Sequence, residues 1–201
     1  MKKLVFMGIL IASTLRAAPS ILINEVSRSG IVWVELRNIS SEVINLNGWK
    51  LRNAHGEDAL SGSVKPGGYI VVCESREQLL SNYPSIHSPI FEVRDGQIGS
   101  GVDPNNDMLE IVAPDGTVVD MVNWGMPRSS WQFYTRDLWN PGIIIHSPVI
   151  ARIPDALDRD MPDDFRGVST GTPGEMNQVY NGLGTVSWGK IKAIFAGQKR
   201  R

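Results

Sequence analysis

The sequence predicts an all-β fold, a sandwich of short strands joined by turns. Twenty glycines and twelve prolines fall mostly between short apolar runs, which is typical of many strands separated by turns. Of the 201 residues, 42% are hydrophobic and 20% are charged, a balance that indicates a packed core and not a disordered chain. The third observation is a hairpin pattern at residues 109–124, LEIVAPDGTVVDMVNW.

This hairpin is the best-defined element of the sequence. Its two apolar runs flank Pro114-Asp115-Gly116, where proline presets the second position of a type I turn and glycine accepts the positive φ that comes after it. Alternation predicts that Glu110 and Asp120 lie on the polar face. The predicted apolar face is formed by Leu109, Ile111, Val119 and Met121. A second layer must cover this face.

The other elements are predicted from similar local patterns. Strand-like runs at residues 21–26 and 31–37 flank a polar loop and predict a second hairpin. Ser75 followed by Gln78 is a capping-box pattern, which predicts a short helix to about residue 81. The only cysteine, Cys73, has no partner for an internal disulfide and is expected to be a small buried thiol. Further strands are expected at residues 43–46, 49–52, 69–73 and 90–93.

Residues 1–18 have the layout of a secretory signal peptide. Lys2 and Lys3 precede an apolar run over residues 4–15, and small residues come after it at positions 17 and 18. The run is shorter than the roughly 20 residues that a membrane-spanning helix needs. The alternative is a buried N-terminal helix. We therefore expect a secreted or cell-envelope protein.

Several short motifs occur in a fixed order along the chain. They are Ile23-Asn24-Glu25, residues 33–36 with Asn38, residues 46–51 (LNGWKL), residues 66–72, residues 106–111, residues 115–120, Ala151-Arg152, and Thr172-Pro173-Gly174 with Asn177. In this order they resemble a lamin-tail domain, with an ending similar to that of bacterial secreted members, over residues 20–178. The resemblance implies an immunoglobulin-like β-sandwich that serves as an interaction module without catalytic residues.

The sequence lacks the common motifs of serine hydrolases, zinc proteases and phosphate-binding loops. Glu25 and Glu35 lie on adjacent predicted strands and can face each other. They form either the acid pair of a small extracellular hydrolase or charges on a solvated sheet face. The solvated face is the simpler interpretation, and we expect no enzymatic activity.

Two acidic segments suggest calcium as the only candidate cofactor. Asp103, Asn105 and Asp107 alternate oxygen-bearing side chains as calcium loops do, but turns stabilised by Asp and Asn explain the same pattern. We favour the turn. The second segment, residues 155–164, alternates acids with arginines near Arg152, and a solvated, ion-paired loop is expected there.

The segment between the last hairpin and the Ala151-Arg152 motif, residues 125–148, is longer than the family pattern leads us to expect. We interpret it as an aromatic insertion loop. Exposed aromatic rings would form a platform for sugar rings or a protein partner, whereas packed rings would cover an edge of the sandwich. We favour packing. The candidate binding residues are Trp131, Phe133, Tyr134 and Trp139.

Residues 179–184 contain two glycines and are expected to link the sandwich to a basic amphipathic tail, residues 185–201. This tail has three alternative roles: it docks on the sandwich, it contacts a membrane surface, or it serves in attachment or sorting. The body before the tail is acidic, which argues against a nucleic-acid partner. The tail's candidate attachment residues are Trp188, Lys190, Ile191, Lys192 and Phe195.

Together these observations predict a non-enzymatic interaction module that presents its loops and strand edges to a protein or carbohydrate partner at the cell surface. Two alternatives remain. One is the small hydrolase that would use Glu25 and Glu35. The other is a structural cell-surface protein held by its basic tail.

Overall fold

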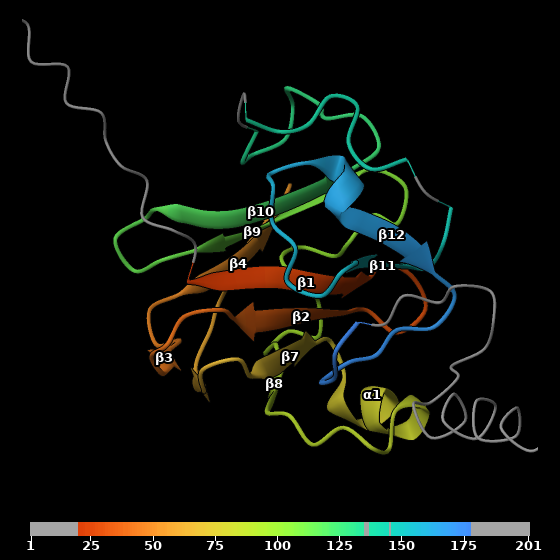
Figure 1. The fold of residues 1–201 in the computed structure, drawn as a ribbon. Helices are drawn as coiled ribbons and strands as arrows, with labels where there is room; N and C mark the ends of the chain where they lie inside the picture. Colours follow the sequence, from red (N-terminus) through yellow and green to blue (C-terminus); the bar gives the residue numbers. More distant parts are fainter. Residues whose placement is uncertain (1–19, 135–136, 145, 178–201) are drawn as a thin grey trace, which may run out of the picture.

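The computed structural model describes residues 20–134, 137–144 and 146–177, and they form a β-sandwich (Figure 1). The larger sheet has the order β12-β11-β1-β2-β7-β8, and the smaller has the order β10-β9-β4-β5. This confirms the predicted all-β, immunoglobulin-like class. Among the described residues, no helix has the length and apolar character needed to cross a membrane.

The strands are short, and most neighbours run antiparallel. The larger sheet contains β1 (Ile21–Ser27), β2 (Trp33–Asn38), β7 (Tyr69–Cys73), β8 (Ile90–Glu92), β11 (Val149–Arg152) and β12 (Phe165–Val168). The smaller sheet contains β4 (Lys50–Asn53), β5 (Glu57–Ala59), β9 (Asp107–Val112) and β10 (Val118–Trp124). The remaining elements are the pair β3 (Ile44–Asn45) and β6 (Ser63–Val64), the helix α1 (Arg76–Asn82) and the 3₁₀ turn η1 (Pro162–Asp164).

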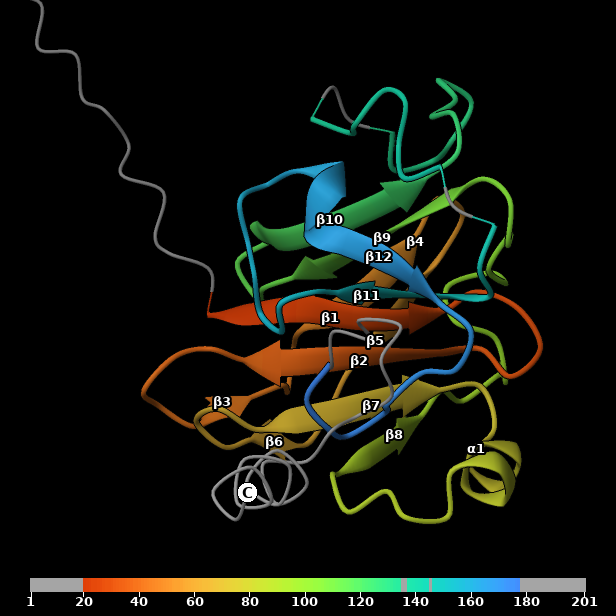
Figure 2. The ribbon, with the colours of Figure 1, turned by 45° about the vertical axis from the view of Figure 1, so that its right-hand side comes forward.

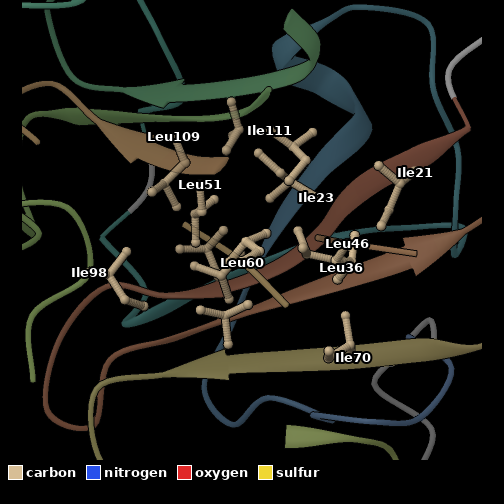
Figure 3. Close-up of a cluster of buried hydrophobic side chains, with 14 of the residues drawn as sticks. Ile21, Ile23, Leu36, Leu46, Leu51, Leu60, Ile70, Ile98, Leu109 and Ile111 are labelled. Atoms are coloured by element: carbon tan, nitrogen blue, oxygen red, sulfur yellow. The ribbon is translucent and has the colours of Figure 1, made fainter. Parts of the chain in front are cut away.

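Aliphatic side chains from both sheets fill the space between them (Figure 3). Ile23 of β1 and Leu36 of β2 come from the larger sheet, while Leu51 of β4 and Ile111 of β9 come from the smaller one. All four are fully buried. Each such side chain contributes about 1.5–3 kcal/mol when it is removed from water, so this layer is the main source of stability.

Most local predictions are confirmed. The amide of Gly116 donates to the carbonyl of Ala113 at 2.9 Å, and Gly116 has φ +87°, as expected after the Pro114 turn. The hydroxyl of Ser75 accepts from the backbone N–H of Gln78 and caps α1. Cys73 is a buried free thiol.

The predicted faces of β10 were wrong for Asp120 and Met121, whereas Val119 packs against the core as expected. A register shift between Val118 and Asp120 inserts an extra residue in β10 relative to β9, so the alternation changes phase there. Asp120 therefore faces the sandwich interior and is 3% exposed. Met121 faces outward, where it packs against Trp131 and other side chains of the outer cluster.

Asp120 is buried with a partner from a distant strand. The Nη2 group of Arg152 donates to both carboxylate oxygens of Asp120, at 2.8 and 2.9 Å, and its Nε donates to the carbonyl of Ile23 at 2.9 Å. Burial raises the pKa of Asp120 to about 6, although Arg152 opposes the change. The expected solvated loop was therefore wrong for Arg152, which is 1% exposed, and for Asp164, which is also buried.

Candidate functional site

The two glutamates predicted to face each other, Glu25 and Glu35, lie on the outer face of the larger sheet. Glu25 of β1 and Glu35 of β2 are direct cross-strand neighbours, as their hairpin predicts. They point away from the sandwich core, because Val26 and Val34 beside them point into it. Their exposed fractions are 1% and 0%, so the expected solvated sheet face was wrong.

The cover over this pair is a segment from the far end of the described chain, residues 169–177, which we name the C-terminal strap. It leaves the end of β12 and crosses β1 and β2 (Figure 2). The amide of Thr172 donates to Glu25 Oε2 at 2.9 Å, and the amide of Gly174 donates to Glu35 Oε2 at 2.6 Å. A Cβ atom at Gly171 would lie 2.5 Å from the ring of Trp33, so only glycine allows this approach.

Asp155, in the connection between β11 and η1, holds the other end of the strap. It forms an ion pair with Arg37 of β2, and its Oδ2 accepts a hydrogen bond from the hydroxyl of Tyr69, with 3.0 Å between the two oxygens. It also accepts from Nδ2 of Asn24 at 2.8 Å and from the amide of Asn177 at 3.1 Å. Sequence analysis missed this convergence, although Asn24, Thr172 and Asn177 all belong to the motifs that it quoted.

The burial of the two glutamates changes their protonation. Desolvation raises the pKa of Glu25 to about 7, against the bonds from Thr172 that lower it. Desolvation also raises the pKa of Glu35 to about 8, with repulsion from Glu25 adding to it and the bond from Asn24 opposing it. The pair therefore retains a proton near neutral pH.

This arrangement leaves no room for a substrate. Glu35 uses both carboxylate oxygens, on Asn24 and Gly174, and Glu25 accepts from Thr172. The cavity beside Glu25 has a volume of about 10 Å³, which holds at most a water molecule. The acids hold the strap and are not open to solvent.

A family model described as Lamin Tail Domain matches residues 14–126, more than half of the 201-residue chain. The chain belongs to the lamin tail domain family. This family consists of immunoglobulin-like modules without catalytic function, in agreement with the two-sheet architecture. No curated protein sequence matches the chain.

The part of this lamin tail domain protein beyond residue 126 is integrated with the matched part. β11 pairs with β1 through Glu25 and Ala151, and the strap lies on β1 and β2. The matched residues thus receive an additional pair of strands and a cover from the later part of the chain.

The aromatic insertion does not present its four rings together. Trp131 is 5% exposed and packs in the outer cluster with Leu138. The ring of Phe133 lies under the guanidinium of Arg52, 4.7 Å from it, and Trp139 packs against Phe165 with 6.3 Å between ring centroids. Tyr134 is 44% exposed. The described part of the loop thus covers the sandwich and leaves a single ring of the four exposed.

The oxygens of the Asp103 segment are used within the loop itself. Asp107 is fully buried, and its Oδ1 accepts from the amides of Ala54 and Met108. Its Oδ2 accepts from the amide of Asp103, whose own carboxylate accepts from the amide of Asn105. Within the described ranges, no group of three acidic, histidine or cysteine side chains is arranged to hold a metal ion. The contacts are those of side-chain-stabilised turns.

The remaining predicted sites lie outside the described residues. These are the signal peptide (residues 1–18), the linker (residues 179–184), and the tail with its residues Trp188, Lys190, Ile191, Lys192 and Phe195. Their roles stay predictions.

Proposed function

We propose that this lamin tail domain protein is a non-enzymatic interaction module that works outside the cytoplasm and binds a protein or carbohydrate partner at the cell surface. The observation that carries the proposal is the closure of the acid pair. Glu25 and Glu35 are the strongest catalytic candidates in the sequence, and the strap occupies the space that a substrate would need. The apolar run at residues 4–15 supports export.

The outer edge of the larger sheet is the docking place that we propose for a protein partner. β12 is the last strand of that sheet, and among the described residues β11 is its only paired neighbour. Arg166 and Gly167 in the middle of β12 are exposed. A cavity of about 410 Å³ lies along residues 167–170. An extended segment of a partner can add to such an edge through main-chain hydrogen bonds.

The test is a binding screen with the protein lacking residues 1–18, immobilised against protein and glycan arrays. Gly167→Lys places a charged side chain on the β12 edge and is expected to abolish capture of a protein partner. Glu42→Lys, in an exposed loop away from this edge, is the matched control and should keep binding. Hydrolysis of an extracellular polymer that disappears in both Glu25→Gln and Glu35→Gln would refute the non-enzymatic function.

A further inference from the structure

The C-terminal strap covers two acids without supplying a positive charge. Its sequence, STGTPGEMN, contains a single charged residue, Glu175, which is itself acidic and exposed. The strap holds the glutamates through the amides of Thr172 and Gly174 and the hydroxyl of Thr172. Burial under the strap raises the pKa values of both glutamates more than the strap's hydrogen bonds lower them, so the closed strap disfavours two ionised glutamates.

The surrounding elements do not provide the missing charge. Arg37 on β2 acts on Glu35, but its guanidinium is paired with Asp155. The guanidinium of Arg152 on β11 is directed to Asp120 on the other side of the sheet. The other titratable groups near the pair are the hydroxyls of Tyr69 on β7 and Tyr83 after α1. Arg37 opposes the rise in the pKa of Glu35 without cancelling it, so a proton supplies the remaining compensation.

The strap is also attached differently from the rest of the sandwich. Within the described residues, no backbone–backbone hydrogen bond joins residues 169–177 to a strand. The strap amides donate to the side chains of Glu25, Glu35 and Asp155, and the hydroxyl of Ser88 donates to the carbonyl of Gly174 at 3.0 Å. At its end, the side chain of Asn177 donates to the carbonyls of Asn24 and Arg152, at 3.1 and 3.2 Å. Every hydrogen bond between the strap and the described strands therefore involves a side chain. A segment held in this way can open while the sheets stay intact.

We propose that the C-terminal strap is a pH-responsive latch, which protonation of the Glu25–Glu35 pair holds closed and ionisation of the pair opens. The direction is set by linkage. Closing the strap removes the acids from water and raises their pKa values to about 7 and about 8, whereas an open strap returns them to solvent. The closed form therefore binds more protons, and a rise in pH favours the open form.

Opening would release residues 169–177 from β1 and β2 and uncover the acidic floor formed by Glu25, Glu35 and Asp155. Closing would hold this segment against the larger sheet.

Hydrogen exchange measured by mass spectrometry on the full chain tests the latch. Protection factors, corrected for the intrinsic pH dependence of exchange, are compared between a peptide covering residues 169–177 and one covering the β9–β10 hairpin. From pH 6 to pH 9 the strap should lose protection by up to about tenfold per pH unit for each proton released. The hairpin should keep its protection.

Variants of the glutamates distinguish opening of the strap from a general loss of stability of the fold. Glu35→Gln removes one of the two titrating acids and should make strap protection depend less steeply on pH, and Glu25→Gln serves the same purpose if Glu35→Gln does not fold. The double variant Glu25→Gln with Glu35→Gln should make strap protection independent of pH. Glu42→Gln, which changes an exposed loop glutamate, should behave as the wild type. Constant strap protection across this range, or equal loss in the strap and the hairpin, would overturn the proposal.

Discussion

Replacement of Glu35 by glutamine should flatten the pH dependence of stability between pH 5 and pH 8, with a constant cost because the amide NH2 meets one of the two N–H donors. Burial raises the pKa of Glu35 from 4.5 to about 8. A group with a raised folded-state pKa contributes stability below its unfolded pKa and loses that contribution as the pH rises through its folded pKa. The window of loss is therefore about pH 4.5 to 8.

The size of the effect is set by the same shift. One pKa unit corresponds to about 1.4 kcal/mol, so a rise from 4.5 to about 8 is worth roughly 5 kcal/mol at high pH. About 3 kcal/mol of this develops between pH 5 and pH 8. Glutamine resembles the protonated acid in shape and does not ionise, so Glu35→Gln should escape this loss.

Urea denaturation followed by tryptophan fluorescence, at several pH values from 5 to 8, measures the unfolding free energies. The wild-type value should fall with pH, and the Glu35→Gln value should stay flatter. Glu42→Gln is the control, since Glu42 is exposed. A wild-type curve that is flat, or a Glu35→Gln protein that is less stable than the wild type by the same amount at both ends, would refute the reasoning.

Four further predictions concern other parts of the chain. Arg152→Met leaves Asp120 without its cation and should lower the unfolding free energy by about 3–5 kcal/mol, measured by denaturation at pH 7; a double variant with Asp120→Asn should recover part of it. Calcium should leave the melting temperature unchanged, because the oxygens of Asp107 are already used, whereas a specific site would add about 2.7 kcal/mol at a hundredfold excess over Kd. Truncation after residue 184 should leave thermal unfolding nearly unchanged and alter binding to anionic vesicles, and a large drop in melting temperature would show that the tail belongs to the core. Intact-mass measurement of protein from its native host should show loss of about residues 1–18; full-length protein in the cytoplasm would contradict secretion.

The features that could be predicted depend on neighbours in the sequence. The Pro114–Gly116 turn and the Ser75 cap are both set within four residues, and both were correct. The direct pairing of Glu25 with Glu35 could also be predicted, from one hairpin. The inward orientation of the Asp120 side chain was not predicted, because a single extra residue in β10 changes the alternation and no local pattern marks that bulge.

The burial of the acid pair was out of reach for a different reason. The amide that covers Glu25 belongs to Thr172, 147 residues further along the chain. The partner of Asp120 is Arg152, 32 residues away and on another sheet. Hydrophobic periodicity reports which residues are apolar, whereas these burials depend on polar groups that meet only after the sheets have formed.

The same distant contacts indicate how far the folding unit extends. Glu25, Glu35 and Asp120 lie within residues 14–126, the part matched by the family model. Glu35 and Asp120 also accept from Asn24 and Ile23 within that part. Their other donors, and those of Glu25, lie beyond it, at Arg152, Thr172 and Gly174. A chain ending at residue 126 would leave the inward-facing Asp120 without its cation and would lose the partner strand that β11 provides to β1. Because an unpaired buried charge costs several kcal/mol and small domains are stable by only about 5–15 kcal/mol, we infer that the cooperative unit continues at least to β11.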